Sequence, residues 1–302
     1  MTIQKLTTTN AFLAIDLPGS PSSAGVVRAA PKVLQGGAIA MARTATYTFA
    51  VRELKVGGMS AGISAEPDER DATIAAFVAE VAPRVEAGEL VIDAAKGVPA
   101  DALADLDAHD PRSPLHREQV DGRSLDEHLL GLGAVVAAEA AFGSLDGRRA
   151  AVEAGPAAAS VTAALAARGL TDVVDDLSAD VDIVFCGSRQ AMIDGAAAET
   201  LAAKVLVPTG AHALSAKGLA VLHRRGIVAL PDFVTTAGPT FAGWPGSATT
   251  VEAVIADAEA TIAAIIAEAN AHEEGPVLAA CYRAEAFLST WQETLPFGRP
   301  LA

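Results

Sequence analysis

The chain has 302 residues, of which 51% are hydrophobic and 20% charged. This length and composition are typical of a compact protein with a sizeable core, and they exclude an intrinsically disordered chain. Lysine and arginine total 22 against 37 aspartate and glutamate residues, which gives a formal charge of -15. Because a field of that sign repels phosphate backbones and anionic lipid surfaces, we expect neither nucleic acid nor a membrane as a partner.

Cysteine usage and the N-terminal sequence indicate where the protein works. Cys186 and Cys281 are far apart in the sequence, so they form neither a disulfide framework nor a paired-cysteine metal site. The first residues lack the basic start and long apolar stretch of a signal peptide, and the longest uncharged run, 233–251, is broken by Pro and Gly. We therefore expect a cytoplasmic protein without a metal and without a membrane segment.

The first third of the chain mixes extended runs with helical periodicity. An amphipathic helix is predicted over 68–87, with Ile74, Phe77, Val78 and Val81 on one stripe. A polar segment crowded with His, Asp and Arg follows at 105–124. The other elements predicted here are a helix over 31–44 and extended runs at 12–17, 24–29, 56–64 and 89–95.

From residue 124 the pattern changes to a long helix that ends before Gly143, followed by regular alternation of strands and helices. Such alternation predicts a parallel sheet wrapped by right-handed crossovers. The predicted strands are 148–154, 172–174, 181–187, 204–209 and 227–233. The predicted helices are the alanine-rich segment ending at 167, then 196–203, 215–226, 249–271 and 278–290.

Parallel sheets bind ligands beyond the carboxyl ends of their strands, where the strand order reverses. The loops that meet this condition are 154–158, 175–178, 186–192, 208–213 and 235–244. Two loops of the first third, 55–62 and 93–98, are expected to face them.

Several stretches resemble the glutamate/leucine/phenylalanine/valine dehydrogenase family, most closely its short leucine- and phenylalanine-type members. The segment GVVR at 25–28 looks like the family's GGxR turn, and RRGIVALPDFVTTAG at 224–238 strongly resembles its Pro-Asp-Phe signature. Further stretches that resemble the family are ATYTFAVRELKVGGMSAGISAEP at 45–67, KVLVPTGAHAL at 204–214 and VLAACYRAEAFL at 277–288.

Pattern and resemblance together predict an α/β fold with two domains and a cleft between them. The first is an N-terminal α/β domain with a mixed sheet, residues 1–128, joined by the C-terminal helix region 272–302. The second is a Rossmann-like domain with a doubly wound parallel sheet, residues 129–271. The resemblance also implies a homo-oligomer, a dimer or larger.

The family deaminates amino acids oxidatively with NAD(P), using one lysine that holds the substrate carboxylate, a second that activates water and an aspartate that relays protons. In the sequence alignment none of these ionisable groups is retained. The two lysines fall on Thr48 and Ser60, and the aspartate falls on Ala95. Three further family positions, a threonine and two asparagines, fall on Leu130, His212 and Thr236. We expect ordinary amino-acid dehydrogenase activity to be lost.

The dinucleotide turn is altered too. Ala154 and Pro156 occupy the first two glycine positions of the G-x-G-x-x-G/A pattern, and proline removes an N–H from the place where a phosphate would bind. We expect NAD binding to be weak or absent, with contacts at Gly155, Ala157, Asp176, Cys186 and Gly187. Asp176 matches the place of a ribose-binding acid, although Asp175 beside it and a purely solvated strand end are alternatives. Cys186 is equally explained as a small buried hydrophobe.

The remaining protonatable residues of the predicted loops are candidates for catalysis. Lys96 and Asp93 flank the position of the missing aspartate, and His212 is placed to exchange protons near neutral pH. The alternatives are a surface lysine and a hydrogen-bonded loop histidine. Substrate contacts are predicted at Ser60, in a glycine-rich turn, and at Gly58, Thr48 and Thr236. The polar cluster within 109–128 matches no common metal-ligand spacing, so a solvated loop is favoured there.

Three hypotheses about function remain. The first is a diverged enzyme that acts on an amino-acid-like or 2-oxo-acid-like small molecule by chemistry other than NAD-dependent deamination. The second is a catalytically silent subunit or ligand-binding module that works beside a paralogous active partner. The third is an NAD-dependent dehydrogenase or imine reductase with rebuilt catalytic residues, among them Lys96 and His212.

Overall fold

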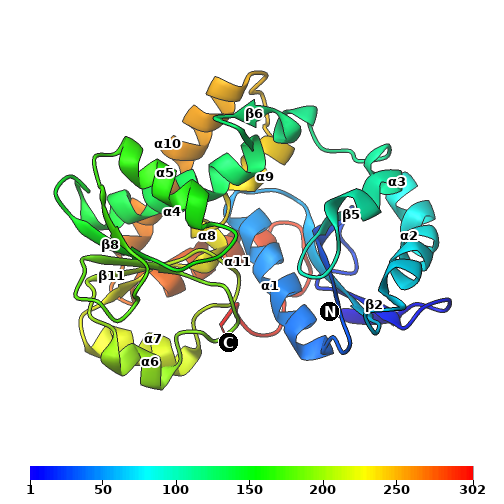
Figure 1. Ribbon diagram of the computed structural model, residues 1–302, viewed down its shortest axis with the longest axis horizontal. Helices are drawn as coiled ribbons and strands as arrows, with labels where there is room; N and C mark the ends of the chain where they lie inside the picture. Colours follow the sequence, from blue (N-terminus) through cyan, green and yellow to red (C-terminus); the bar gives the residue numbers. More distant parts are fainter. Residues whose placement is uncertain (302) are drawn as a thin grey trace. The chain divides into compact units, whose positions relative to one another are not determined.

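The computed structural model describes residues 1–301, and its contacts separate two compact units (Figure 1). Unit 1 contains Met1–Pro111 and Ala284–Pro300, and unit 2 contains Arg112–Arg283. Each unit has its own five-stranded sheet. The predicted α/β class, with one mixed sheet and one parallel sheet, is thereby confirmed.

Unit 1 is built on a mixed sheet in the order β1-β2-β4-β3-β5. β4 pairs antiparallel with β2 and parallel with β3, so it lies between two strands that are consecutive in the sequence. The polar edge strand β1 was not predicted. The strands are β1 (Thr2–Lys5), β2 (Ala11–Ile15), β3 (Ser23–Ala30), β4 (Gly57–Ser64) and β5 (Leu90–Ala94). The helices are α1 (Gln35–Val51), α2 (Arg70–Glu86), η1 (Ala100–Leu103) and α3 (Ala104–Asp107).

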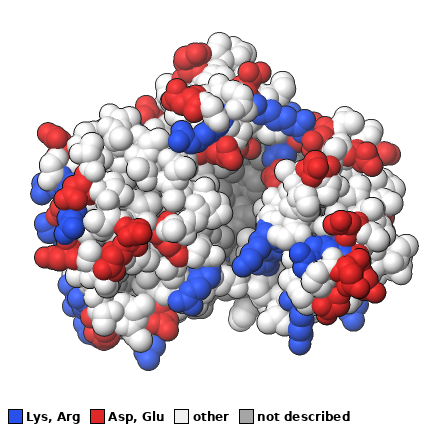
Figure 2. Space-filling view, in the orientation of Figure 1, with Lys and Arg blue, Asp and Glu red and all other residues white. Residues whose placement is uncertain are grey.

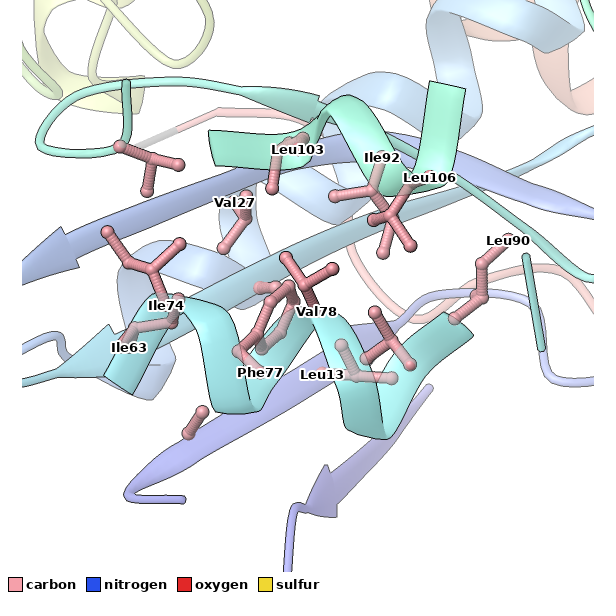
Figure 3. Close-up of a cluster of buried hydrophobic side chains, with 14 of the residues drawn as sticks. Leu13, Val27, Ile63, Ile74, Phe77, Val78, Leu90, Ile92, Leu103 and Leu106 are labelled. Carbon is pink, nitrogen blue, oxygen red and sulfur yellow. The ribbon is translucent and has the colours of Figure 1, made fainter. Parts of the chain in front are cut away.

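The main core of unit 1 lies between α2 and one face of this sheet (Figure 3). The predicted stripe of α2 supplies Ile74, Phe77 and Val78, which are buried against Leu13 and Val27 of the strands. Phe77 has no exposed surface. Burial of such side chains is the main favourable term in folding, at roughly 25 cal/mol per Å² of apolar area.

The other face of the sheet packs closely against α1. A Cβ on Gly58 would lie 1.9 Å from the carbonyl oxygen of Ala42, so only glycine permits this approach. The main-chain N–H of Gly58 donates to Thr46 Oγ1 at 3.0 Å. The glycine-rich segment expected to form a turn at Ser60 is instead the interior of strand β4, where Gly58 permits close packing against α1.

Unit 2 contains a fully parallel sheet in the order β12-β11-β10-β8-β9. Its strands are β8 (Arg149–Val152), β9 (Asp172–Val174), β10 (Ile183–Cys186), β11 (Val205–Pro208) and β12 (Val228–Ala229). Its principal helices are α4 (Leu125–Phe142), α5 (Ala158–Ala167), α6 (Gly195–Thr200), α7 (Ala216–Arg224) and α10 (Val251–Asn270). The remaining elements are η2 (Pro114–Arg117), β6 (Gln119–Val120), β7 (Arg123–Ser124), α8 (Asp232–Thr235), α9 (Gly238–Gly243) and α11 (Pro276–Leu288), whose last residues belong to unit 1.

The segment predicted as a strand over 227–233 is extended only at Val228–Ala229. Pro231 has φ -72 and precedes the short helix α8, which begins at Asp232. Proline is pre-organised for a helix start and has no N–H to continue a strand ladder. The strand prediction was therefore wrong beyond Ala229, and this places Asp232 at a helix start.

Helix α4 begins with a reciprocal capping box. Ser124 Oγ accepts from the N–H of Glu127 at 3.2 Å, and the N–H of Ser124 donates to Glu127 Oε2 at 3.2 Å. We expect Ser124→Ala to lower the free energy of unfolding of unit 2 by about 1 kcal/mol, because a helix N–H loses its partner. Urea unfolding monitored by circular dichroism measures this loss. Ser124→Asp keeps a capping oxygen and should remain close to wild type, and equal losses in both variants would contradict the capping explanation.

The distribution of surface charge and the character of the helices complete the description of the chain. Over the face shown in Figure 2, lysine and arginine side chains are interspersed with aspartate and glutamate. Among the helices formed by residues 1–301, none combines the length and the apolar character needed to cross a bilayer.

Candidate functional site

The parallel sheet of unit 2 has one topological switch point. From β8 the chain proceeds to β9 on one side and then crosses to β10 on the other side. The loops that follow β8 and β10 flank this point, which is where open parallel sheets bind ligands. The N–H of Glu153, the residue after β8, donates to the carbonyl oxygen of Phe185 in β10 at 2.9 Å. This bond holds the two strand ends together.

Glu153 directs its side chain into the loop after β10. Its Oε2 accepts from the N–H of Gly187 at 2.7 Å and from the N–H of Ser188 at 2.9 Å, and its Oε1 accepts from the Ser188 hydroxyl. Partial burial by itself would raise the pKa of Glu153, but the hydrogen bonds from Gly187 and Ser188 and the charge of Arg189 together lower it. An ionised carboxylate therefore occupies a converging set of N–H donors.

The turn between β8 and α5 carries the predicted cofactor contacts Gly155 and Ala157. Gly155 is exposed, and a Cβ added to it would lie 4.0 Å from the Cβ of Ser188, so the turn passes close to the Glu153 cluster. Ala157 is the N-cap residue of α5 and offers no side-chain acceptor. Pro156 stands between them without an N–H.

The other three predicted cofactor contacts differ in accessibility. Asp176 is exposed, and its Oδ1 accepts from the N–H and hydroxyl of Ser178, which lowers its pKa. Cys186 is buried at the end of β10, where burial, with a contribution from Glu153, raises the pKa of its thiol to about 12. Gly187 packs against the next loop, because a Cβ on it would lie 2.4 Å from the nitrogen of Gly210. The cofactor roles of these residues stay predictions.

These residues do not fit the pyrophosphate of a dinucleotide. A phosphate at a switch point needs unoccupied N–H donors and space for close approach to the backbone. Here the N–H groups of Gly187 and Ser188 are already bonded to the Glu153 carboxylate, and Pro156 supplies no donor. Gly187, Ser188 and Pro156 therefore offer no free main-chain N–H to a phosphate.

A second cluster joins the loop after β11 to the start of α8. The N–H of His212 donates to Asp232 Oδ2 at 2.5 Å, and the N–H of Phe233 donates to Asp232 Oδ1 at 2.8 Å. His212 has a φ of 63, in the left-handed region, so the bond to Asp232 helps to hold an unfavourable backbone conformation. The Thr236 hydroxyl donates to the Asp232 carbonyl oxygen at 2.7 Å. The structure thus brings the predicted residues His212 and Thr236 together around Asp232.

Burial shifts the pKa of both ionisable groups of this cluster. Asp232 is 7% exposed, and burial raises its pKa from 3.8 to about 6 despite the hydrogen bonds it accepts. His212 is 8% exposed, and burial lowers the pKa of its imidazole below 6.5. A neutral imidazole and a carboxyl group with a pKa of about 6 are both of the kinds that transfer protons, and here the main-chain N–H of His212 links the two residues. Sequence reasoning missed Asp232, although an acid directly after Pro231 at a predicted strand end was a usable signal.

In unit 1 the predicted substrate contacts are largely engaged by the fold. Thr48 Oγ1 donates to the carbonyl oxygen of Thr44 at 3.0 Å within α1, and Gly58 is packed against the same helix. Ser60 is fully buried in β4, and its hydroxyl has no hydrogen-bond partner among residues 1–301. Their roles in substrate binding stay predictions.

One face of the sheet in unit 1 gathers polar side chains. Val26 of β3 is in register with Ser60 on one side and Asp93 on the other, so these three residues share a face. Arg28 lies two residues further along β3 on that face. It is half-buried, and its Nε has no hydrogen-bond partner within residues 1–301. Burial lowers the pKa of its guanidinium, which stays charged and can hold a carboxylate.

Lys96 lies beyond the end of β5. Its side chain is exposed, and its carbonyl oxygen accepts from the N–H of Ala29 at 3.0 Å. Gly97 follows with φ 86, and a Cβ on it would lie 2.0 Å from the Ala29 carbonyl oxygen. The loop is therefore fixed by its backbone, while the ammonium group remains accessible. A catalytic role for Lys96 or Asp93 stays a prediction.

Two further features concern metals and cavities. Residues 1–301 contain no group of three His, Cys, Asp or Glu side chains placed to hold a metal ion. A cavity of about 680 Å³ lies in unit 2 beside the edge strand β12. It is lined by residues of α7, such as Leu219 and His223, and by the segment between α10 and α11, such as His272 and Glu274. The predicted site residues lie elsewhere.

Solved structures of amino-acid dehydrogenases have a similar fold over almost the whole chain. The hetero-hexameric glutamate dehydrogenase from Thermus thermophilus, in its Leu-bound form, matches with a TM-score of 0.78 and 17% identity, covering 95% of this chain and 86% of that one. L-tryptophan dehydrogenase from Nostoc punctiforme matches with a TM-score of 0.69 and 18% identity, covering 97% of both chains. Glutamate dehydrogenase from Peptoniphilus asaccharolyticus gives 0.70 and 17%, covering 94% and 87%.

These matches show an amino-acid-dehydrogenase-like fold. No protein-family model matches the sequence, and no curated protein matches it. At such low identity a shared fold does not carry substrate or reaction with it.

Proposed function

We propose that the protein is a diverged member of the amino-acid dehydrogenase family that acts on an amino-acid-like or 2-oxo-acid-like small molecule without NAD-dependent deamination. The observation that carries this proposal is the Glu153 carboxylate at the switch point of a dehydrogenase-like fold, where it is bonded to the N–H groups of Gly187 and Ser188. The neutral residues Thr48 and Ser60 at the positions aligned with the two lysines support the same conclusion.

The remaining polar groups are suited to proton transfer. In unit 1, Arg28 can hold a carboxylate by charge-assisted hydrogen bonds, and in unit 2, His212 can exchange a proton. Asp232 acts through the main chain, because it accepts from the N–H of His212 and so positions the loop. Lys96 is the second candidate for the base, since its ammonium group is accessible.

A two-part assay tests the proposal. The purified chain is incubated with leucine, phenylalanine, glutamate or tryptophan and NAD or NADP, and NAD(P)H formation is followed by absorbance. In parallel, amino acids and 2-oxo acids without nucleotide are followed by proton NMR, which detects exchange or consumption. We expect turnover only in the second assay. Efficient oxidation of leucine or phenylalanine with NAD would overturn the proposal.

Variants connect that turnover to the site. We expect His212→Ala or Lys96→Ala to lower the rate by about 10²-fold, whichever removes the group that transfers the proton. Lys5→Ala and His223→Ala are matched controls, because both residues are exposed and lie outside the site, and should leave the rate unchanged. If neither Lys96→Ala nor His212→Ala lowers the rate, neither residue takes part in the mechanism. Absence of turnover with the chain alone, and its appearance with a paralogous subunit, would favour a silent partner.

We further propose a cytoplasmic homo-oligomer, a dimer or larger. The support is the similarity in fold to a hetero-hexameric dehydrogenase. Light scattering of the purified chain at several concentrations tests the assembly, and a monomer at all of them would contradict it.

A further inference from the structure

We infer that the Glu153 carboxylate is an internal anion held by main-chain N–H groups at the switch point, beside the turn after β8, so that this site selects against phosphate-bearing ligands. The inference deepens the proposed function and rests on it only for the statement that a small molecule is bound. The inference states which ligands the site excludes. The experiment that tests it measures ligand binding and does not depend on turnover.

Two consecutive main-chain N–H groups, those of Gly187 and Ser188, converge on one carboxylate oxygen at 2.7 and 2.9 Å. Successive N–H groups that point to one spot form an anion-binding concavity, and phosphates bind such concavities at the ends of parallel strands. The Ser188 hydroxyl donates to the second carboxylate oxygen, so both oxygens are engaged. The chain itself thus supplies the anion.

Charge at this position also acts against a phosphate. The bonds from Gly187 and Ser188 lower the pKa of Glu153, so the carboxylate is ionised at neutral pH. A phosphate brought to the same donors would meet a like charge at a few ångströms, a separation at which charges repel even where water screens them in part. The cation that acts on Glu153 is Arg189, which is exposed. A neutral or cationic ligand group meets no such repulsion.

Removal of the Glu153 carboxylate distinguishes this role from a purely structural one. A glutamate that only caps the turn would be needed for stability, and its removal would lower stability without changing which ligands bind. If Glu153 instead excludes phosphate, its removal should increase the affinity for phosphate-bearing ligands. Gly155 is exposed, so a ligand can reach the turn beside Ser188 from solvent.

The experiment compares adenosine, ADP and inorganic pyrophosphate as probes in isothermal titration with the full chain. For the wild type we expect ADP to bind no more tightly than adenosine. For Glu153→Gln, which keeps the side-chain shape, and for Glu153→Ala, we expect ADP and pyrophosphate to bind at least about tenfold more tightly than in the wild type, with adenosine unchanged. Glu252→Gln removes one exposed carboxylate from α10 and should leave all three affinities unchanged.

Several results would overturn the inference. One is a wild type that binds ADP at least tenfold more tightly than adenosine, a measurement that needs no variant. Another is a folded Glu153 variant, as judged by circular dichroism, without any gain for ADP or pyrophosphate. An equal gain in affinity for ADP in Glu252→Gln would show that the change in net charge, and not the position of Glu153, causes the effect. Turnover of an amino or oxo acid in the same preparations reports separately on the proposed function.

Discussion

Asp16→Asn is expected to lower the free energy of unfolding of unit 1 by about 3–5 kcal/mol, because it leaves a buried guanidinium without its counter-charge. Asp16 is 1% exposed at the end of β2, and Arg43 of α1 is 7% exposed. Arg43 donates from Nε to both carboxylate oxygens, at 2.9 and 2.8 Å, and from Nη2 to Oδ1 at 2.8 Å. The same guanidinium donates from Nη1 to the carbonyl oxygens of Phe297 and Gly298. One ion pair therefore joins β2, α1 and the C-terminal segment.

The measurement is the midpoint of urea unfolding at constant slope, since a changed slope would report a changed unfolded state instead. The exposed pair of Arg84 and Glu89, 2.9 Å apart, provides the matched control. Glu89→Gln should change stability by less than about 1 kcal/mol, as is usual for ion pairs in water. Replacing Asp16 and Arg43 together with leucine should recover part of the loss. A loss for Asp16→Asn no larger than that for Glu89→Gln would contradict the prediction.

The parts of the fold that sequence could predict are those recorded in local periodicity. The apolar stripe of α2 and the alternation of strands and helices after residue 148 both appear in the structure, because they reflect which side of an element is buried. The polar strand β1 and the glycine-bearing helix α9 were missed. Both depend on neighbours rather than on their own residues: β1 on its antiparallel pairing with β2, and α9 on packing against α4 and α10.

The candidate site was harder to predict, since its decisive contacts are made by backbone groups. Glu153 bonds to N–H groups that every residue except proline possesses, so nothing in the sequence marks Gly187 and Ser188 as its partners. The same applies to the bond between the N–H of His212 and Asp232. An acid after an apolar strand was the available signal in both cases. This signal marks the acid itself, but it does not identify the N–H groups that bond to it.

Asp232 gives the last prediction, because burial raises its pKa from 3.8 to about 6. Between these two values the folded chain keeps a proton on Asp232 that the unfolded chain has released. The stability contributed by this group is therefore complete below about 3.8 and is lost as the pH rises through about 6. A pKa change of this size corresponds to about 3 kcal/mol.

Asp232→Asn removes this titration while keeping an oxygen that can accept from His212 or Phe233. We expect the stability difference, wild type minus variant, to fall by about 3 kcal/mol between about pH 3 and pH 7, measured by urea unfolding at each pH. Asp176→Asn is the control of opposite sign, because its hydrogen bonds to Ser178 lower the pKa of Asp176. There the wild type should gain on the variant as the pH rises. A difference for Asp232→Asn that does not change with pH would show that the carboxyl group stays ionised in the fold, and that the loop bearing His212 is held independently of proton uptake.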